Sequence, residues 1–213
     1  MKFLSFKHKQ RVSFGVVKDQ EIIDLGAKNP DINDLREAIR QDRLTELKDQ
    51  ANSLAPEYSL KEIEFLPTIP NPEKIICIGV NYADRNAEYK DGSKPPKYPS
   101  VFMRTRESLV GHQQNIMDPP ESDQLDYEGE IVLVIGKNGR RVPIEKASQH
   151  VAGITCMNEG SVRDYLRHAK FNVTQGKNFE KSVHLDLGWL LQMNLIHSLH
   201  LKSNHGKRRI KAK

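Results

Sequence analysis

Apolar and polar positions alternate in short runs over the first part of the chain. The segments KFLSF and RVSFGVVKDQEIIDL are rich in β-branched and aromatic residues and are interrupted by turn residues. This pattern predicts a small meander of β-strands. After it, DINDLREAIRQDRLTELKDQ changes to helical spacing, with apolar residues at Ile32, Leu35, Ile39 and Leu47. Those positions predict one amphipathic helix with Asp31 as its N-cap.

A proline-rich segment separates this front part from the rest. APEYSLKEIEFLPTIPNPEK contains a short alternating run and four prolines, which predicts an edge strand followed by a linker. Beyond residue 70 apolar runs dominate. We therefore expect three parts: a small N-terminal α+β module over 1–70, a larger part over 71–182, and a basic tail over 183–213.

The larger part carries four candidate strands and two candidate short helices. The strands are KIICIGVNY, YPSVFMRTRESLVG, GEIVLVIGK and VAGITCMNEGSV, and the helices are PIEKASQHV and SVRDYLRHAK. Strands without long helices between them argue against a doubly wound parallel sheet. The expected fold class is α+β, mostly β.

The net charge of +5 belongs to one end of the chain. Residues 183–213 hold six Lys or Arg and a single acid, Asp186, so they account for the whole excess. The rest is formally neutral, and nucleic-acid binding by the body of the protein is not expected. The run KRRIKAK leaves one alternative open, a basic module that contacts nucleic acid through its tail.

Hydropathy and cysteine usage favour a cytoplasmic protein without membrane partners. No apolar run is long enough to span a bilayer, and the start MKFLSFKHKQR is apolar for too few residues to be a secretory signal. Cys77 and Cys156 both stand in apolar runs. We expect them to be small core residues, not parts of a disulfide or a metal knuckle.

Two carboxylates at the mouth of an apolar strand are the clearest chemical feature. In LDYEGEIVLVIGK, Glu128 and Glu130 lie two residues apart and so point to the same side of a strand. Like charges on one face repel, and a hard divalent cation bound through oxygen would remove that repulsion. Glu159 also ends an apolar strand, so the three acids together predict a Mg²⁺ or Mn²⁺ site. The alternative is that Glu128 and Glu130 are surface acids on an edge strand.

Four segments, in this order, resemble the fumarylacetoacetate hydrolase family: KIICIGVNYADRNAEY, SLVGHQQNIMDPPESDQLDYEGEIVLVIGK, VAGITCMNEGSVRD and TQGKNFEKS. The resemblance implies a metal-dependent enzyme with a mixed β-roll, usually a homodimer. Such enzymes hydrolyse, decarboxylate or isomerise small 2-oxo acids and acyl pyruvates. The resemblance also implies that Glu128, Glu130 and Glu159 are the metal ligands. The third ligand is more often Asp in the family, and Glu reaches one methylene further.

The same resemblance implies roles for residues after the third acid. Lys177 in GKNFE matches the family's active-site lysine, where an ammonium would stabilise an enolate; a solvated lysine is the alternative. Arg163 and Gln175 match polar contacts to substrate oxygens, and arginine suits a carboxylate through two parallel hydrogen bonds. For Arg163 the alternative is an ion pair on a helix surface. Tyr127 points away from the side of Glu128, so we expect it in the core.

One motif departs from the family pattern. Many members have N-Y-x-x-H-x-x-E, whose His and Glu activate water, whereas this chain has NYADRNAE, with Arg85 before Glu88. Arginine stays protonated at neutral pH and cannot act as a base. Glu88 could still be the base, and Arg85 could bind a substrate carboxylate; an ion pair between the two is the plain alternative. Isomerisation and decarboxylation tolerate this change better than hydrolysis does.

The last segment departs further. The family continues with Gly-Pro-Trp and more strands, whereas this chain reads VHLDLGWLLQMN and then becomes basic. One choice of codons for a family-like continuation encodes residues 183–194 when it is read one base forward. We therefore hypothesise that 183–213 is an out-of-frame product, and we expect weak or no activity from a body truncated in this way. A noncatalytic subunit in a dimer is the remaining alternative.

Overall fold

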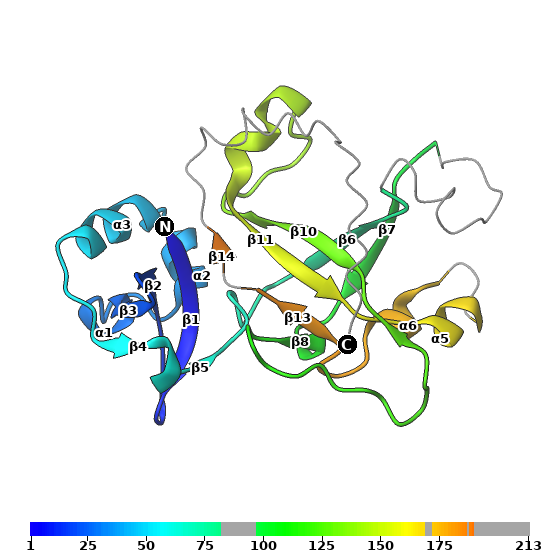
Figure 1. Ribbon diagram of the computed structural model, residues 1–213. Coiled ribbons are helices and arrows are strands. Elements are labelled where there is room, and N and C mark those ends of the chain that lie inside the picture. The colour runs from blue at the N-terminus through cyan, green and yellow to red at the C-terminus, as the bar shows by residue number, and fades with distance from the viewer. Residues whose placement is uncertain (82–96, 169–171, 187, 190–213) are drawn as a thin grey trace.

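The computed structural model describes residues 1–81, 97–168, 172–186 and 188–189. Strands of one large sheet are β1 (Lys2–His8), β2 (Arg11–Lys18), β3 (Glu21–Asp24), β4 (Tyr58–Ser59), β5 (Glu64–Phe65), β8 (Leu109–Val110), β10 (Gly129–Ile135), β11 (Val151–Glu159), β13 (Val183–Leu185) and β14 (Gly188–Trp189). Within the described residues the strand order is β4-β3-β2-β1-β14-β11-β13-β8, with β10 paired to β11 and β5 to β1. The β8–β13 ladder is parallel. Figure 1 shows the sheet passing from the N-terminal module into the larger part of the molecule.

Two short sheets and several short helices complete the described structure. The sheets pair β6 (Ile75–Gly79) with β7 (Ser100–Arg104) and β9 (Leu125–Asp126) with β12 (Ser161–Val162). The α-helices are α1 (Leu25–Lys28), α2 (Leu35–Arg40), α3 (Leu44–Asn52), α5 (Arg163–His168) and α6 (Thr174–Lys177). Turns of 3₁₀-helix occupy Leu60–Glu62, Arg106–Ser108 and Ile144–His150. The sequence-based prediction of an α+β, mostly β fold is confirmed. None of the helices in these ranges has both the length and the apolar composition needed to cross a membrane.

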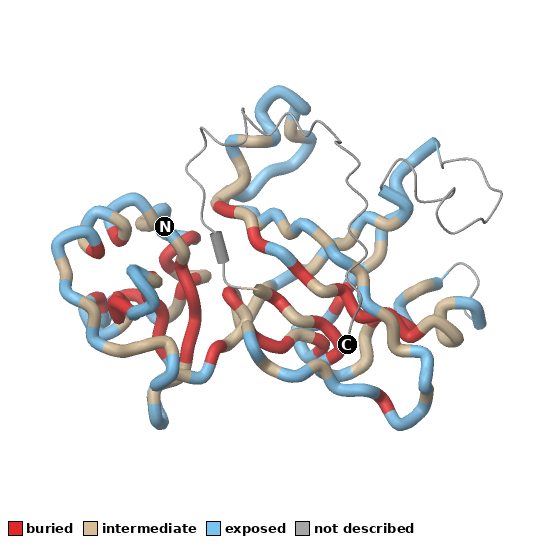
Figure 2. Tube along the Cα trace, in the orientation of Figure 1, coloured by how far each residue is buried: buried red, intermediate tan, exposed pale blue. Residues whose placement is uncertain are grey.

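The predicted N-terminal meander is formed by β1, β2 and β3. Side chains on successive positions of β1 point to opposite faces, so Phe3 packs toward α2 and α3 while Leu4 and Phe6 pack on the other face. Figure 2 shows the buried positions concentrated along these strands. Both faces of this part of the sheet are therefore covered.

The helix predicted from Asp31 onward is two helices. The carboxylate of Asp34 accepts a hydrogen bond from the backbone N–H of Glu37 at 2.7 Å and caps α2. The chain then turns at Asp42, which has a positive φ of 57°, a conformation that Asp tolerates better than most residues do. Asp31 pairs with the side chain of Arg43 instead. The prediction of one helix capped by Asp31 is wrong, because that carboxylate lies outside the first turn.

Strand β10 buries only one of its faces. Val132 and Val134 lie on the half-buried face, together with Glu130, whereas Leu133 is 53% exposed on the other. Tyr127 shares the exposed side and is 72% exposed. The expectation that Tyr127 belongs to the core is wrong, since the side of the strand opposite the glutamates faces outward.

The two cysteines also differ from expectation. Cys77 on β6 is half-buried, and Cys156 on β11 is exposed. Each strand has one side open to solvent, so an apolar run in the sequence does not guarantee two-sided burial. The expectation of two core cysteines is wrong for Cys156.

The first residues of the segment 183–213 take part in the sheet. Val183 and Leu185 are buried against Met157 of β11, and the backbone of β14 pairs with both β1 and β11. This segment therefore connects the N-terminal strands to the larger part. Residues 187 and 190–213 lie outside the described residues.

Candidate metal centre

The sheet register places the three predicted acids on one face. Glu128 immediately precedes β10, and Glu159 is the last residue of β11. These strands are antiparallel, with Glu130 opposite Met157, and the backbone N–H of Glu159 donates to the carbonyl of Glu128 at 2.7 Å. Because side chains alternate along a strand, Glu128, Glu130 and Glu159 point to the same side of this ladder.

The three carboxylates fit a hard divalent cation. One oxygen from each of Glu128, Glu130 and Glu159 lies within 4.8 Å of the others. Glu159 is buried and the other two are half-buried. All three donors are carboxylate oxygens, which Mg²⁺ and Mn²⁺ prefer and which suit softer metals less well. A basic side chain already lies between two of these carboxylates and balances part of their negative charge.

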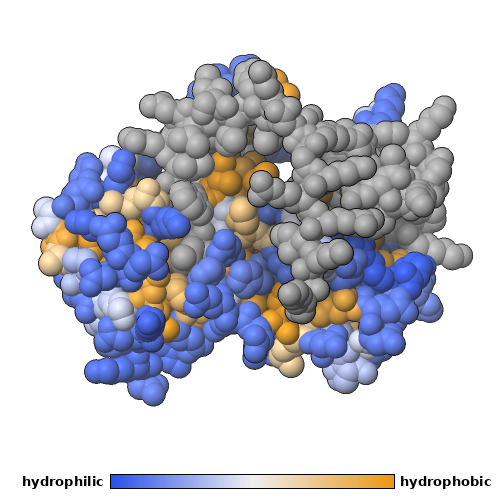
Figure 3. Space-filling view, viewed as in Figure 1, coloured by the Kyte–Doolittle hydropathy of each residue, from blue (hydrophilic) through white to orange (hydrophobic). Residues whose placement is uncertain are grey.

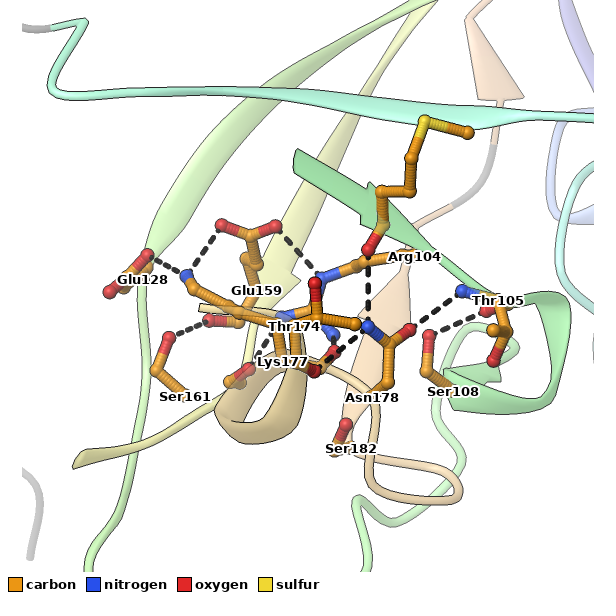
Figure 4. A network of polar contacts seen from close by, with 12 residues as sticks. Arg104, Thr105, Ser108, Glu128, Glu159, Ser161, Thr174, Lys177, Asn178 and Ser182 are labelled. Atoms are coloured by element: carbon orange, nitrogen blue, oxygen red, sulfur yellow. Dashed lines mark hydrogen bonds and ion pairs between the residues drawn. The ribbon is translucent and has the colours of Figure 1, made fainter. Parts of the chain in front are cut away.

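That side chain is Lys177, the last residue of α6. Its Nζ donates to Glu128 Oε2 at 2.7 Å and to Glu159 Oε2 at 2.8 Å. Figure 4 shows the ammonium between the two carboxylates. The ammonium also lies 5.2 Å from the ring centroid of Phe102, within the range of a cation–π contact. The alternative of a solvated lysine is therefore wrong for this structure, in which Lys177 is buried.

Arg163 reaches the cluster from the start of α5. Its guanidinium lies 2.8 Å from Glu128 Oε1 through Nη1 and 2.8 Å from Asp126 Oδ2 through Nη2. Arginine can donate in two directions at once from its planar fork. The ion pair expected as the alternative role of Arg163 is present, and its partner Glu128 is one of the three clustered acids.

Arg104, at the end of β7, belongs to the cluster but was not singled out from the sequence. Its Nε donates to Glu159 Oε1 at 2.8 Å and its Nη2 donates to the carbonyl of Gly160 at 2.6 Å. A third contact joins its Nη1 to the carbonyl of Lys177. Arg104 is buried, with 4% of its surface exposed. The available signal was its position at the end of an apolar strand, the same position that drew attention to Glu159.

Burial and charge oppose each other at Glu159. Burial would raise the pKa of its carboxyl group, but the ammonium of Lys177 and the guanidinium of Arg104 outweigh burial and lower that pKa. At Cys77, burial first and then the negative charge of Glu159 raise the pKa of the thiol to about 12. The thiol therefore stays protonated at neutral pH beside an ionised carboxylate.

For three predicted site residues the structure gives no contact with this cluster among the described residues. Gln175 is exposed on α6, two residues before Lys177. Arg85 and Glu88 lie in 82–96, outside the described residues. The structure thus brings together Glu128, Glu130, Glu159, Lys177 and Arg163, adds Arg104, and leaves the proposed base untested.

Comparison with known proteins identifies the family. Residues 74–190 match the family described as fumarylacetoacetate (FAA) hydrolase C-terminal, which is more than half of the chain. The chain belongs to this family. The matched region runs past residue 182, where the sequence analysis places the end of the larger part.

The curated relatives of this family member include oxaloacetate tautomerases. A mitochondrial oxaloacetate tautomerase of Bos taurus is 36% identical over 148 residues, which cover 68% of this chain and 46% of that protein. The oxaloacetate tautomerase YisK of Bacillus subtilis is 40% identical over 126 residues, covering 58% and 41%. The chain therefore spans about half the length of the curated relatives it matches.

Solved structures of the family share the fold. The fumarylacetoacetate hydrolase of Exiguobacterium antarcticum has a TM-score of 0.63 at 25% identity, over 86% of this chain and 64% of that one. The maleylpyruvate hydrolase of Sphingobium, solved with manganese(II) and pyruvate, has a TM-score of 0.66 at 22% identity, over 87% and 65%. At that identity the second likeness supports the fold alone.

Proposed function

We propose that this protein catalyses keto–enol tautomerisation of a small 2-oxo acid such as oxaloacetate, with Mg²⁺ or Mn²⁺ held by Glu128, Glu130 and Glu159. One observation carries the proposal: three carboxylates converge beside a buried lysine and an arginine. The two tautomerase relatives, at 36% and 40% identity, supply the substrate class.

Each basic residue has a task in this reaction. A hard divalent cation held by the glutamates would stabilise negative charge on the 2-oxygen of the substrate. Lys177 supplies an ammonium for the same developing charge. Arg163, which pairs with Glu128 and Asp126 in this structure, is the proposed partner of a substrate carboxylate. Gln175 on the same short helix as Lys177 is the proposed contact to a further substrate oxygen.

The proton must be moved between carbon and oxygen by a base. We retain Glu88 for this role and Arg85 for binding a substrate carboxylate, as the sequence indicates. Tautomerisation consumes no water, so it does not require the His–Glu pair that this chain lacks. Decarboxylation and hydrolysis of a C–C bond are the competing reactions at such a site.

Several wider expectations stay predictions beside this proposal. They are the mixed β-roll of the family, the homodimer, the cytoplasmic location and the division of the chain at residues 70 and 182. The alternative of nucleic-acid binding rests on residues 207–213, which lie outside the described part of the chain, and neither tautomerase relative points to it.

The test follows the decay of enol-oxaloacetate by its ultraviolet absorbance, with chelator-treated protein and with added Mn²⁺. We expect a Mn²⁺-dependent rate that falls about 100-fold in Glu130→Gln, equivalent to about 2.7 kcal/mol of lost transition-state stabilisation. Arg106→Gln is the control, because Arg106 is exposed and pairs with Glu107, which is not one of the three proposed ligands. Since weak or no activity is expected from the sequence analysis, Mn²⁺ binding is measured on the same samples.

Two results would contradict the proposal. One is a rate that does not depend on Mn²⁺ or on Glu130. The other is conversion of oxaloacetate to pyruvate faster than tautomerisation, detected with lactate dehydrogenase, which would assign the site to a decarboxylase.

A further inference from the structure

Lys177 lies between two of the three glutamates that are proposed to hold the metal. Its Nζ lies 2.7 Å from Glu128 Oε2 and 2.8 Å from Glu159 Oε2, and its side chain is 6% exposed. One ammonium thus joins two of the three proposed ligands. It acts as an internal counter-ion that lowers the cost of burying their negative charge.

Two arginines hold the opposite oxygens of the same carboxylates. Arg163 Nη1 lies 2.8 Å from Glu128 Oε1, and Arg104 Nε lies 2.8 Å from Glu159 Oε1. Each carboxylate therefore has one oxygen fixed by an arginine and the other directed at Lys177. The arginines thus orient the two carboxylates, and both Oε2 atoms contact the same cation, the ammonium of Lys177.

We propose that Lys177 is a built-in competitor for the metal position: its ammonium bridges Glu128 and Glu159 until a divalent cation displaces it, and the displaced ammonium then turns to the substrate. This inference rests on the proposed function, because it takes the glutamates as metal ligands. Two cations cannot share the same oxygens at contact distance without strong repulsion. Binding of the divalent cation and release of the Lys177 ammonium from the two carboxylates are therefore a single exchange reaction.

The backbone around Lys177 is held independently of its ammonium. The carbonyl of Lys177 accepts a hydrogen bond from Arg104. The side chain of Asn178 donates to the carbonyl of Met103 at 3.1 Å and accepts from the backbone N–H of Thr105 at 2.7 Å. These bonds join the end of α6 to β7, as Figure 4 shows. The flexible four-carbon stem can then move while the helix stays in place.

The ammonium of Lys177 also determines which cations can bind at the three glutamates. A monovalent cation carries the same charge as the ammonium and gains no Coulombic advantage over it. A divalent cation carries twice the charge and can displace it. The site should therefore discriminate against Na⁺ and K⁺, and it should bind Mn²⁺ less tightly than the same three glutamates would without the lysine.

The experiment measures Mn²⁺ affinity by electron paramagnetic resonance of free Mn²⁺ for the wild type, Lys177→Met, Lys177→Gln and Arg163→Gln. We expect both Lys177 variants to bind Mn²⁺ about tenfold more tightly than the wild type, because the competitor is gone. Arg163→Gln removes one positive charge beside Glu128 but no competitor, so its affinity should rise much less.

The outcomes separate this inference from the proposed function. Equal or weaker Mn²⁺ binding by the Lys177 variants overturns the exchange, and so does an equal gain in Arg163→Gln, which would be a general charge effect. In either case the proposed metal site is still supported if Glu130→Gln binds Mn²⁺ more weakly than the wild type does. Failure of every protein to bind Mn²⁺ overturns the proposed function and the exchange with it.

Chemical labelling gives a second test on the unaltered protein. Acetylation by an N-hydroxysuccinimide ester, followed by mass spectrometry, should modify Lys177 slowly without metal and faster with Mn²⁺. Lys181, whose side chain is 53% exposed, is the control and should react at the same rate in both conditions. A Lys177 rate that does not rise with Mn²⁺ contradicts the exchange.

Discussion

The apolar core of the N-terminal module and the surroundings of the glutamates bury different kinds of side chain. In the module, Phe14, Leu35 and other apolar residues fill the space between β1–β3 and the two helices. Around β7, β11 and α6 the buried groups include Arg104, Glu159 and Lys177. The first region gains free energy from apolar burial, whereas the second depends on pairing charges that would be costly alone.

The two regions also differ in what they leave exposed. Apolar side chains point outward from β6, β7 and β10, among them Ile78, Val101 and Leu133, which are 45%, 56% and 53% exposed. On the face of the molecule drawn in Figure 3, apolar surface appears in patches among polar surface. An apolar pattern in the sequence is thus buried on both faces in β1 and on only one face in β10.

The largest effect is expected in the apolar region. Phe14→Ala should lower the free energy of unfolding by about 4 kcal/mol, because a fully buried ring leaves a cavity in the core. Urea denaturation measures this. Val12→Ala on the same strand is the control, since Val12 is 60% exposed, and it should change stability by less than about 0.5 kcal/mol. Similar losses in both variants would contradict the contrast between the exposed start and the buried middle of β2.

A somewhat smaller effect is expected in the charged region. Arg104→Met should destabilise the protein by about 3 kcal/mol, because it leaves the buried carboxylate of Glu159 without one of its partners. Arg106→Met, two residues later, removes an exposed arginine and should have little effect on the urea midpoint. If the two substitutions proved equally mild, the buried ion pairs would not be what stabilises this region.

Helix capping gives a still smaller and more local effect. Asp34→Ala should cost about 1 kcal/mol, because the N-terminal N–H groups of α2 lose their acceptor. Asp31→Ala should cost less, because Asp31 makes an ion pair with Arg43 rather than a cap. Thermal unfolding of the two variants ranks them, and a larger loss in Asp31→Ala would restore the cap predicted from the sequence.

Acid should weaken the charged region gradually. The pKa of Glu159 is lowered in the folded state, so its contribution is fully present well above the ordinary pKa of a glutamate and is lost as pH falls through the folded value. The urea midpoint should therefore decline as pH is lowered below about 4.5. Glu159→Gln should show a shallower decline over the same range, and an unchanged slope would contradict the assignment.

Much of the fold followed from alternation and turn residues. The meander, the fold class and the strand that carries Glu130 were predictable because side-chain period is a local property. The single helix capped by Asp31 was wrong, because the left-handed turn at Asp42 interrupts a spacing that otherwise continues. The exposure of Tyr127 could not be predicted, since alternation gives two faces but does not say which of them is covered.

The candidate site shows the same limit. The grouping of Glu128, Glu130 and Glu159 followed from alternation and from acids at strand ends. Lys177 was predicted as a site residue only from the family resemblance. Its place between two carboxylates could not be predicted, because it depends on how β10 and β11 pair and on where α6 lies relative to them. Arg104 was missed because in the sequence it begins the polar run RTRE, and only the tertiary fold buries the end of β7.

The most direct test of the central claim is an anomalous difference map from crystals of the 213-residue protein soaked in Mn²⁺. The account predicts one peak bounded by oxygens of Glu128, Glu130 and Glu159, with the ammonium of Lys177 moved out of that position. A map with no peak among the three carboxylates, and with Lys177 still bridging Glu128 and Glu159, would contradict it.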